Sequence, residues 1–395
     1  MKVLSIVHGP VFGGGNNQVA HLHEPLARRG WEIRAAVPDV PEGVPTLERM
    51  RAAGVPTDAI PLHRLRRTLS PRIHAEFALS IPREIRMLRR MIREHDIDLV
   101  QAFGETNPHL AIAGHLEGRA VVWHLYDLAA PQLARTLGMT YVKRLADVIL
   151  TWGRGMADFY PGATSLGDRW LPVYPPVDCD LFRPDPERRA AARRELGVPE
   201  DALLIGTVGN RNPTKRHDVL VEAVRVLRDR GLDVWCRVFG QRSPSHERHM
   251  AEVDALVERL GLSDRVEFLD PGARVAELLP ALDVFTMSSE SEGMPTVIVE
   301  AMASGLPIVA TDVGSIREVV EDGPCGIVVP PLDPPALADA IARMLADAVA
   351  REELGRANRE RALERYATER VADVYAAAYE RAVAHRRTRR RSGGR

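Results

Sequence analysis

The 395-residue chain contains no run of about 18 apolar residues, the length that a membrane-spanning helix needs. Residues 1–8 form too short an apolar run for a signal peptide and lead directly into a glycine loop. Only three cysteines are present, widely spaced and without a Cys-x-x-Cys pair. This pattern argues against a disulfide framework and against a zinc site. We therefore expect a soluble, cytoplasmic protein.

The chain also lacks an excess of charge of either sign. It has 53 Lys and Arg residues against 54 Asp and Glu residues, for a net charge of −1. Because nucleic-acid-binding proteins usually present a strongly basic face, this balance argues against a nucleic-acid partner. Lysine is rare, since Lys2, Lys143 and Lys215 are the only three. A lysine inside a glycine-containing loop, such as Lys215, therefore stands out.

Positive charge gathers only at the C-terminal end, where residues 385–391 read His-Arg-Arg-Thr-Arg-Arg-Arg. We expect residues 386–395 to form a basic, disordered and solvated tail. The alternative is a weak peripheral contact with anionic lipid at the inner face of the membrane, at about 1 kcal/mol per cation.

Short apolar strands alternate with helical stretches along the chain, as in a parallel sheet with helices on both faces. The alternation breaks at residues 171–186, where five prolines mark a linker, and then restarts. We expect an α/β fold of two Rossmann-like domains, residues 1–176 and 177–368. Residues 369–385 are expected to form a helix that crosses back to the first domain. In such sheets, ligands bind beyond the carboxyl ends of the strands.

The strongest motif is Ser-Ser-Glu-Ser-Glu-Gly-Met-Pro-Thr-Val-Ile-Val-Glu-Ala-Met-Ala-Ser-Gly at residues 288–305. It follows an expected strand at 284–287, and Pro295 suits the first turn of a helix. The free N–H groups of that turn would form an anion site. Glu292 precedes the helix and Glu300 lies one to two turns along it, where carboxylates can accept hydrogen bonds from sugar or ribose hydroxyls. Taken alone, such a spacing favours a structural interpretation, with Glu292 as a helix cap and Glu300 as a solvated carboxylate.

With its context, the motif resembles that of the retaining glycosyltransferases of family 4, which have the GT-B fold. Ser289, Glu292, Gly293 and Glu300 match the family pattern, which continues through Ala301-Met302-Ala303, Gly305 and Pro307 to Gly326. The resemblance implies that Glu292 meets the donor sugar and Glu300 the nucleotide ribose. It implies a donor site that also includes Gly293, Met294, Pro295 and Thr296.

The loop after the strand at 203–208 reads Gly209-Asn-Arg-Asn-Pro-Thr-Lys215. A cation here is well placed to neutralise a leaving diphosphate. The family carries Gly-Arg-x-x-x-x-Lys at this place, so the resemblance implies that Lys215 binds phosphate. Asn210 occupies the position of the arginine, and Arg211 follows it. Arg211 is therefore either a phosphate ligand or a solvated loop residue.

Gly13, Gly14 and Gly15 follow the first strand, and glycines let backbone N–H groups approach a ligand closely. The resemblance places Gly14 and Gly15 beside the donor phosphates. The rival is a nicotinamide-dinucleotide fingerprint, but its last glycine position would hold Gln18. Asp39, near the end of the second strand, keeps this rival open.

His124 follows an expected strand at 120–123. A lone histidine is more often structural than catalytic, but the family has a histidine at this strand end, close to the reacting carbon. The resemblance therefore implies a catalytic His124, with Asp127 as its orienting residue or as an acceptor contact. Asp178-Cys179-Asp180 resembles a metal-binding Asp-x-Asp motif, but it lies in the proline-rich linker. We expect no metal and no cofactor other than the nucleotide sugar.

Together these features predict a retaining, metal-independent glycosyltransferase that moves a sugar from a nucleotide diphosphate to an acceptor. The second domain would bind the donor and the first the acceptor, which can be a glycan, a lipid-linked or a small molecule. The alternatives are a dinucleotide-dependent oxidoreductase, a non-catalytic nucleotide-sugar-binding protein and a sugar-nucleotide epimerase. The resemblance is weakest from residue 40 to residue 146, in the expected acceptor half.

Overall fold

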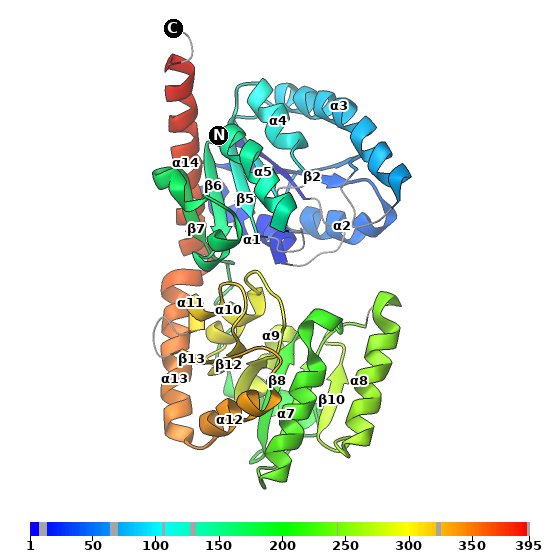
Figure 1. The fold of residues 1–395 in the computed structure, drawn as a ribbon. Helices are drawn as coiled ribbons and strands as arrows, with labels where there is room; N and C mark the ends of the chain where they lie inside the picture. Colours follow the sequence, from blue (N-terminus) through cyan, green and yellow to red (C-terminus); the bar gives the residue numbers. More distant parts are fainter. Residues whose placement is uncertain are drawn as a thin grey trace. The chain divides into compact units, whose positions relative to one another are not determined.

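A computed structural model describes residues 1–7, 14–63, 70–104, 107–126, 132–242, 244–320 and 325–392. The chain divides into two compact units, each built around one parallel sheet (Figure 1). The first unit combines residues 1–176 with residues 368–395, and the second holds residues 177–367. The C-terminal helix therefore belongs to the unit that also contains the N-terminus.

The sheet of the first unit has the strand order β3-β2-β1-β4-β5-β6-β7. Its strands are β1 (Lys2–Ile6), β2 (Glu32–Pro38), β3 (Thr57–Ile60), β4 (Leu99–Phe103), β5 (Ala120–Leu125), β6 (Val148–Trp152) and β7 (Trp170–Val173). All neighbouring strands are parallel, and the central ones are almost entirely buried, as expected for a sheet covered on both faces. The order reverses at β1, which lies between β2 and β4, so this sheet has a topological switch point there.

Helices connect these strands and cover the sheet. They are α1 (Gly14–Arg28), α2 (Val44–Ala52), α3 (Pro71–Glu94), α4 (His109–Leu116) and α5 (Gln132–Leu145). The helix α1 ends at Arg28, and Gly30, two residues later, has the positive φ of 81° that favours glycine after a helix. The helix α3 packs against α4 and lies beside it in Figure 1.

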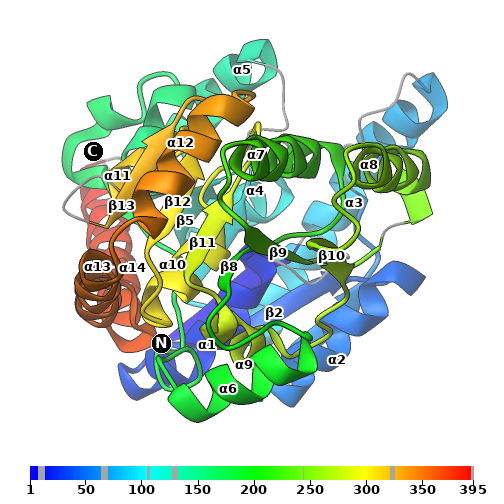
Figure 2. The same cartoon turned by 90° about the horizontal axis from the view of Figure 1, so that it is seen from below.

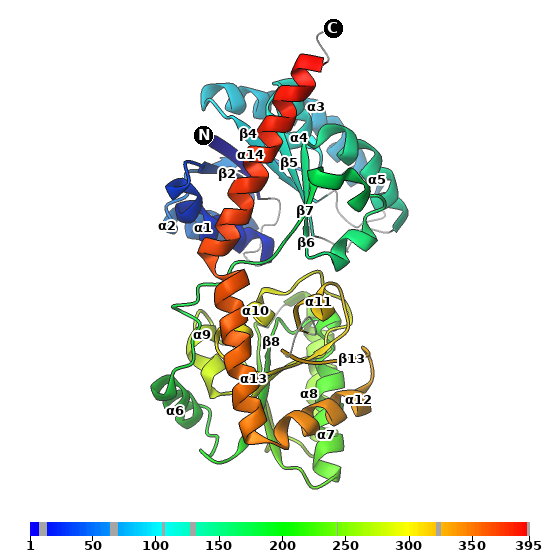
Figure 3. The same cartoon turned by 90° about the vertical axis from the view of Figure 1, so that its left-hand side faces the viewer.

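The C-terminal helix α14 (Thr368–Ser392) packs against α1 and β5 of the first unit, as Figure 3 shows. Two tyrosines one turn apart are fully buried in this contact. Tyr379 donates a hydrogen bond of 2.6 Å to Gln101 Oε1, and Tyr375 accepts one from Gln18. The four-residue spacing places both rings on one helix face, which is the face that meets the sheet.

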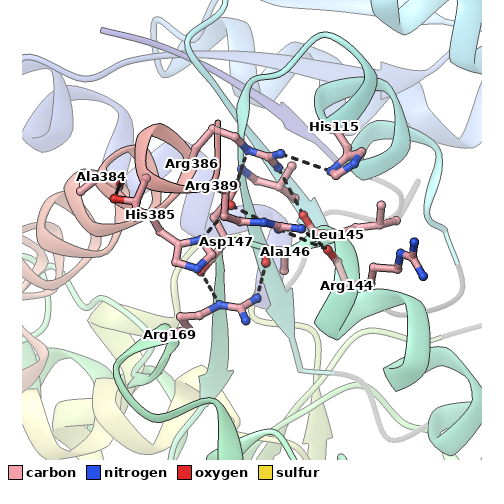
Figure 4. Close-up of polar contacts among 12 residues, drawn as sticks. His115, Arg144, Leu145, Ala146, Asp147, Arg169, Ala384, His385, Arg386 and Arg389 are labelled. Carbon is pink, nitrogen blue, oxygen red and sulfur yellow. Dashed lines mark hydrogen bonds and ion pairs between the residues drawn. The ribbon is translucent and has the colours of Figure 1, made fainter. Parts of the chain in front are cut away.

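The arginine-rich end of α14 is bound to a buried carboxylate (Figure 4). Asp147, between α5 and β6, accepts hydrogen bonds from Val121 N and Arg386 Nε at 2.9 Å each. His385 Nδ1 lies 3.0 Å from the other Asp147 oxygen. The prediction of a disordered tail from residue 386 is therefore wrong for residues 386–392, which continue the helix. A partner 239 residues away in the sequence explains why local composition did not reveal it.

The sheet of the second unit has the order β10-β9-β8-β11-β12-β13. Its strands are β8 (Leu203–Val208), β9 (Val234–Phe239), β10 (Val266–Leu269), β11 (Val284–Met287), β12 (Ile308–Thr311) and β13 (Gly326–Val329). Neighbours are again parallel, and the switch point lies between β8 and β11.

The second unit contains the helices α6 (Pro186–Glu195), α7 (His217–Asp229), α8 (Glu247–Arg259), α9 (Val275–Leu278), α10 (Thr296–Ala303), α11 (Ile316–Val320), α12 (Pro334–Leu345) and α13 (Ala348–Arg361). Helix α7 packs against α8 and α12, and α10 packs against α13 (Figure 2). A single apolar core fills the space between the sheet and the helices α7, α8 and α12.

Among the described residues, the sequence pattern predicts eleven of the thirteen strands and does not predict β3 and β7. The strand β7 lies at the start of the proline-rich segment, where Pro172 pairs with Thr151 on the sheet edge. Proline is tolerated there because an edge strand leaves one side unpaired. The fold class, two Rossmann-like α/β sheets, is confirmed. Within the residues described, no helix is both long and apolar enough to cross a bilayer.

Candidate functional site

The loops that follow β8 and β11 lie side by side in the second unit, because these two strands pair at the switch point of its sheet. The first loop ends in a short 3-10 turn, Pro213–Lys215, before α7 begins. The second loop runs from Ser288 to Pro295, before α10 begins. The topology therefore brings together the two motifs that the sequence indicated, although they are separated by more than 70 residues.

Lys215 and Glu292 form the centre of this arrangement. Lys215 Nζ donates a hydrogen bond of 2.7 Å to Glu292 Oε1, and both side chains are largely buried. Ser289 Oγ donates a second hydrogen bond, of 2.8 Å, to the same oxygen. The carboxylate is thus fixed in position, and within the described ranges its Oε2 atom accepts no hydrogen bond. The cation and the anion stand where a diphosphate and a sugar could be bound together.

Two glycines allow this close packing. A Cβ atom on Gly314 would lie 2.2 Å from the carbonyl oxygens of Glu292 and Gly293, and Gly314 also has a positive φ of 57°. A Cβ atom on Gly209 would lie 3.1 Å from Cε of Lys215. Only glycine therefore fits behind the Glu292 loop, and the stem of Lys215 lies against the backbone at Gly209.

The helix α10 starts beside this pair. Pro295 is its N-cap residue and makes no side-chain capping hydrogen bond, so the first turn keeps N–H groups directed away from the helix. Met294 is buried and anchors the loop. Glu300, one turn after Thr296, is half-buried, and this burial raises its pKa to about 7, against a hydrogen bond from Thr296 that lowers it.

Arg211 does not join this group. Its guanidinium binds Asp254 and the carbonyl oxygen of Met250, and it lies 3.9 Å from the ring centre of Phe268. With only 4% of its surface exposed, the side chain fills a structural position between loop and helix. We therefore leave Arg211 out of the donor site proposed below. Its partners on α8 and β10 could not be read from the local motif.

His124 lies in the first unit, at the carboxyl end of β5, and is fully buried. Its Nδ1 atom lies 3.3 Å from the Tyr375 hydroxyl, and the rings of Phe103, Tyr126 and Trp152 surround it within 5.8 Å between centres. Burial lowers the pKa of His124 to about 3, so the imidazole is neutral near pH 7. The Nδ1 atom is within hydrogen-bond distance of the Tyr375 hydroxyl, whereas Nε2 is buried and has no hydrogen-bond partner among the described residues.

The remaining candidates of the first unit are only partly placed. Gly14 and Gly15 are the first two residues of α1. Gly13 and Asp127 lie outside the described residues.

The Asp178–Asp180 pair is a turn. Asp178 Oδ1 accepts hydrogen bonds from the backbone N–H groups of Asp180 and Leu181, at 3.0 and 2.9 Å. Its carboxylate has a local structural role, which fits the interpretation of this segment as a domain junction.

The sequence did not identify two supporting positions. Gly314 was one residue of a long match, and its contact with the Glu292 loop depends on the packing of two distant loops. Tyr375 lies 251 residues after His124, so no local pattern connects the two residues.

Solved structures with the same fold cover almost the whole chain. A glycosyltransferase from Rickettsia africae superposes with a TM-score of 0.79 over 97% of this chain and 98% of that chain, at 17% identity. Anabaena Alr3699/HepE in complex with UDP superposes with a TM-score of 0.80 over 96% of this chain and 100% of that chain, at 22% identity. At these identities the likeness concerns the fold, which is that of the GT-B glycosyltransferases.

Two family models match the sequence. The model of the glycosyl transferase 4-like domain matches residues 13–161, and that of glycosyl transferases group 1 matches residues 188–361. The chain therefore belongs to the glycosyltransferases of the family 4 type. Over 226 aligned residues it is 34% identical to the D-inositol 3-phosphate glycosyltransferase of Corynebacterium urealyticum. The aligned region covers 56% of this chain and 53% of that relative. The chain thus matches about half the length of such curated relatives.

Proposed function

We propose that this protein transfers a sugar from a nucleotide diphosphate to an acceptor, with the donor bound by the second unit. The observation that carries the proposal is the contact between Lys215 and Glu292 at the switch point of the second sheet. Open α/β sheets bind ligands at this place. The family membership supports the reaction class, and a structural neighbour of the same fold holds UDP-glucose.

In this proposal, Lys215 neutralises charge on the diphosphate as the glycosidic bond to the leaving phosphate breaks. The helix α10 begins four residues after Glu292, and the N–H groups of its first turn would add a favourable dipole for an anion. Preorganised donors of this kind stabilise developing negative charge without reorganisation. Glu292, held by Ser289, accepts a hydrogen bond from a sugar hydroxyl through the oxygen that Lys215 does not use.

Glu300 would accept hydrogen bonds from the ribose. Its raised pKa reflects burial without a strong partner, and ribose hydroxyls would supply the missing donors. Near pH 7 the free protein would therefore hold this group partly protonated. Donor binding would favour the ionised form.

The finer points of the proposal are retention of the anomeric configuration, metal independence and a catalytic role for His124. Retention comes from the family resemblance. Two observations support metal independence. Lys215 supplies a cation beside the expected phosphate. The Asp178 carboxylate accepts hydrogen bonds from the backbone of its own turn. A neutral His124 could hydrogen-bond the sugar or the acceptor but could not act as a cationic acid near pH 7.

The exposed arginines at the end of α14 suggest a weak membrane contact. Arg387 and Arg391 are exposed, whereas Arg386 is bound to Asp147. We propose that the exposed arginines add about 1 kcal/mol each to binding of anionic lipid. Co-sedimentation with vesicles containing phosphatidylserine, compared with purely zwitterionic vesicles, tests this: equal sedimentation would contradict it.

A thermal-shift panel tests the donor proposal most directly, because a ligand that binds only the folded state raises the melting temperature. The panel should contain UDP-, GDP- and ADP-glucose together with NAD. A rise with a nucleotide sugar is expected. A rise with NAD alone would favour the oxidoreductase alternative.

Turnover then separates the remaining alternatives. Incubation of the best donor with D-inositol 3-phosphate, the acceptor that the names of the relatives suggest, should release the nucleoside diphosphate and form a glycoside. Binding without nucleotide release for any acceptor would indicate a non-catalytic protein. A changed sugar without acceptor would indicate an epimerase.

A further inference from the structure

Arg216 joins the Lys215 turn to α7 in a backbone conformation that arginine rarely adopts. Its φ and ψ are 48° and 49°, in the left-handed region that a Cβ atom disfavours and that glycine enters freely. Within the described residues of the second unit, Leu332 is the only other non-glycine residue with a positive φ. Backbone strain of this kind persists only where surrounding contacts hold it, and it is frequent at functional sites. The contacts around Arg216 therefore show what holds the strained backbone.

The turn at Arg216 brings Lys215 against the loop that follows β11. Ser288 Oγ on that loop donates a hydrogen bond of 3.0 Å to the carbonyl oxygen of Lys215. The backbone N–H group of Glu290 donates one of 2.9 Å to the carbonyl oxygen of Thr214. The direction of both carbonyl groups depends on the chain reversal, because α7 begins directly after Arg216. The strained residue thus lies where the two loops of the proposed donor site are joined.

The guanidinium of Arg216 connects α7 to the same loop. Its Nε and Nη2 atoms donate to the Asp218 carboxylate at 3.0 and 2.7 Å, and Nη1 donates to Glu290 Oε2 at 2.9 Å. Because Asp218 lies in the first turn of α7, it fixes the guanidinium relative to the helix. The planar fork of arginine can bridge two carboxylates in this way, whereas the compact ammonium group of lysine is poorly suited to it.

We propose that Arg216 is a positioning residue of the donor site. Its ion pair with Glu290 holds the strained turn against the loop after β11, and the turn holds Lys215 in place for the second phosphate of a nucleoside diphosphate. Arg216 itself does not contact the phosphate, because each of its three nitrogens faces a carboxylate oxygen. This inference rests on the proposed function, in which Lys215 binds the diphosphate.

Calorimetric titration with UDP, GDP and ADP, each compared with its monophosphate, tests this role. The monophosphate lacks the phosphate expected at Lys215 and is the internal reference. Arg216→Lys keeps the charge and the strained backbone but cannot bridge Asp218 and Glu290. It should bind the preferred diphosphate about tenfold more weakly than the wild type, because a displaced ammonium group loses a charge-assisted hydrogen bond. Binding of the monophosphate should not change. Wild-type affinity in Arg216→Lys would show that only the charge matters, and would overturn the inference.

Arg216→Gly separates the donor site from overall stability, because it removes the ion pairs and the backbone strain together. Its urea-unfolding midpoint should stay close to that of the wild type, whereas its diphosphate affinity should fall as in Arg216→Lys. Leu332→Gly relieves the other positive φ of this unit and is the matched control, with unchanged diphosphate binding expected. If Arg216→Lys does not fold, Arg216→Gly and Glu290→Ala carry the test.

Glu290→Ala removes the carboxylate that Arg216 holds and should also weaken the diphosphate complex. The double variant Arg216→Gly/Glu290→Ala should bind no more weakly than Arg216→Gly, because both changes break one contact. Tighter diphosphate binding by Glu290→Ala would mean that the released guanidinium binds phosphate itself, which overturns the positioning role. A wild-type protein that binds no diphosphate more tightly than its monophosphate would contradict the proposed function as well. Tight wild-type binding that the Arg216 variants retain would contradict this inference alone.

Discussion

Lys215 Nζ lies 2.7 Å from Glu292 Oε1, so the cation and the carboxylate of the proposed donor site pair with each other in the free protein. The pair joins two loops of the second unit that lie 77 residues apart in the sequence. A diphosphate that approaches Lys215 must share this cation with Glu292. The contact therefore holds both side chains in position before a donor binds. Removal of either side chain leaves the other without its charged partner.

Lys215→Ala should lower kcat/KM for UDP-glucose at least tenfold, towards the roughly 100-fold that is typical when one preorganised electrostatic contact is removed. The change removes the cation and leaves Glu292 facing the phosphate without a counter-charge. Initial rates of nucleotide release measure this effect. Arg228→Ala, which removes an exposed cation paired with Asp264 elsewhere in the same unit, is the control. Equal rates for both variants would remove Lys215 from the donor site.

Glu300 should couple donor binding to pH. Its pKa is raised from 4.5 to about 7, so a ribose that hydrogen-bonds to the carboxylate must displace a proton. Binding of UDP-glucose should therefore strengthen as pH rises through about 7, with proton release in calorimetry carried out in buffers of different ionisation enthalpy. Glu300→Gln should abolish this proton release. A wild-type affinity that is flat from about pH 6 to pH 8 would contradict the ribose contact.

The same group should affect stability in the absence of donor. Between about pH 4.5 and pH 7 the folded protein holds a proton on Glu300 that the unfolded chain has released, so stability falls as pH rises across this window. Glu300→Gln cannot ionise and escapes this loss. The melting temperature of the variant relative to the wild type should therefore be higher at about pH 8 than at about pH 5. A constant difference would show that the carboxyl titrates normally in the fold.

Gly314→Ala should impair donor binding through the backbone. The new Cβ atom would lie 2.2 Å from the Glu292 carbonyl oxygen, so the loop must move and take the carboxylate with it. We expect at least a tenfold loss of UDP-glucose affinity in calorimetry. Gly261→Ala is a matched control, because Gly261 has a similar positive φ of 64° but nothing within 4 Å of the new methyl group. Similar affinities for both variants would mean that the loop is not held by this contact.

Arg386→Ala should destabilise the first unit by about 3 kcal/mol, because it leaves the buried Asp147 carboxylate without its main counter-charge. The urea-unfolding midpoint of the variant measures this loss. The neighbouring Arg387 is exposed, and Arg387→Ala should stay within about 0.5 kcal/mol of the wild type. If Arg386→Ala were as mild as Arg387→Ala, the end of α14 would not be anchored by Asp147.

Local patterns were enough for the fold class and for most of the strands. Buried parallel strands appear as short apolar runs, and glycine and proline mark their ends, so the predicted bounds of β8 and β11 agree with the structure to the residue. The motif at 288–305 also predicts its own helix, because Pro295 marks the start of a short helix and Gly305 its end. The resemblance to the family, and not this spacing alone, indicates Glu292, Glu300 and Lys215 as a group.

What the sequence could not decide depends on partners that lie far away along the chain. The sequence offers Arg211 as a candidate phosphate ligand, whereas in the fold Asp254 and Phe268 hold it. The sequence also predicts a disordered tail from residue 386, whereas Arg386 in the helix binds the buried Asp147. Short-range pattern determines which elements form. Only tertiary packing determines which charges are buried, paired or left to meet a ligand.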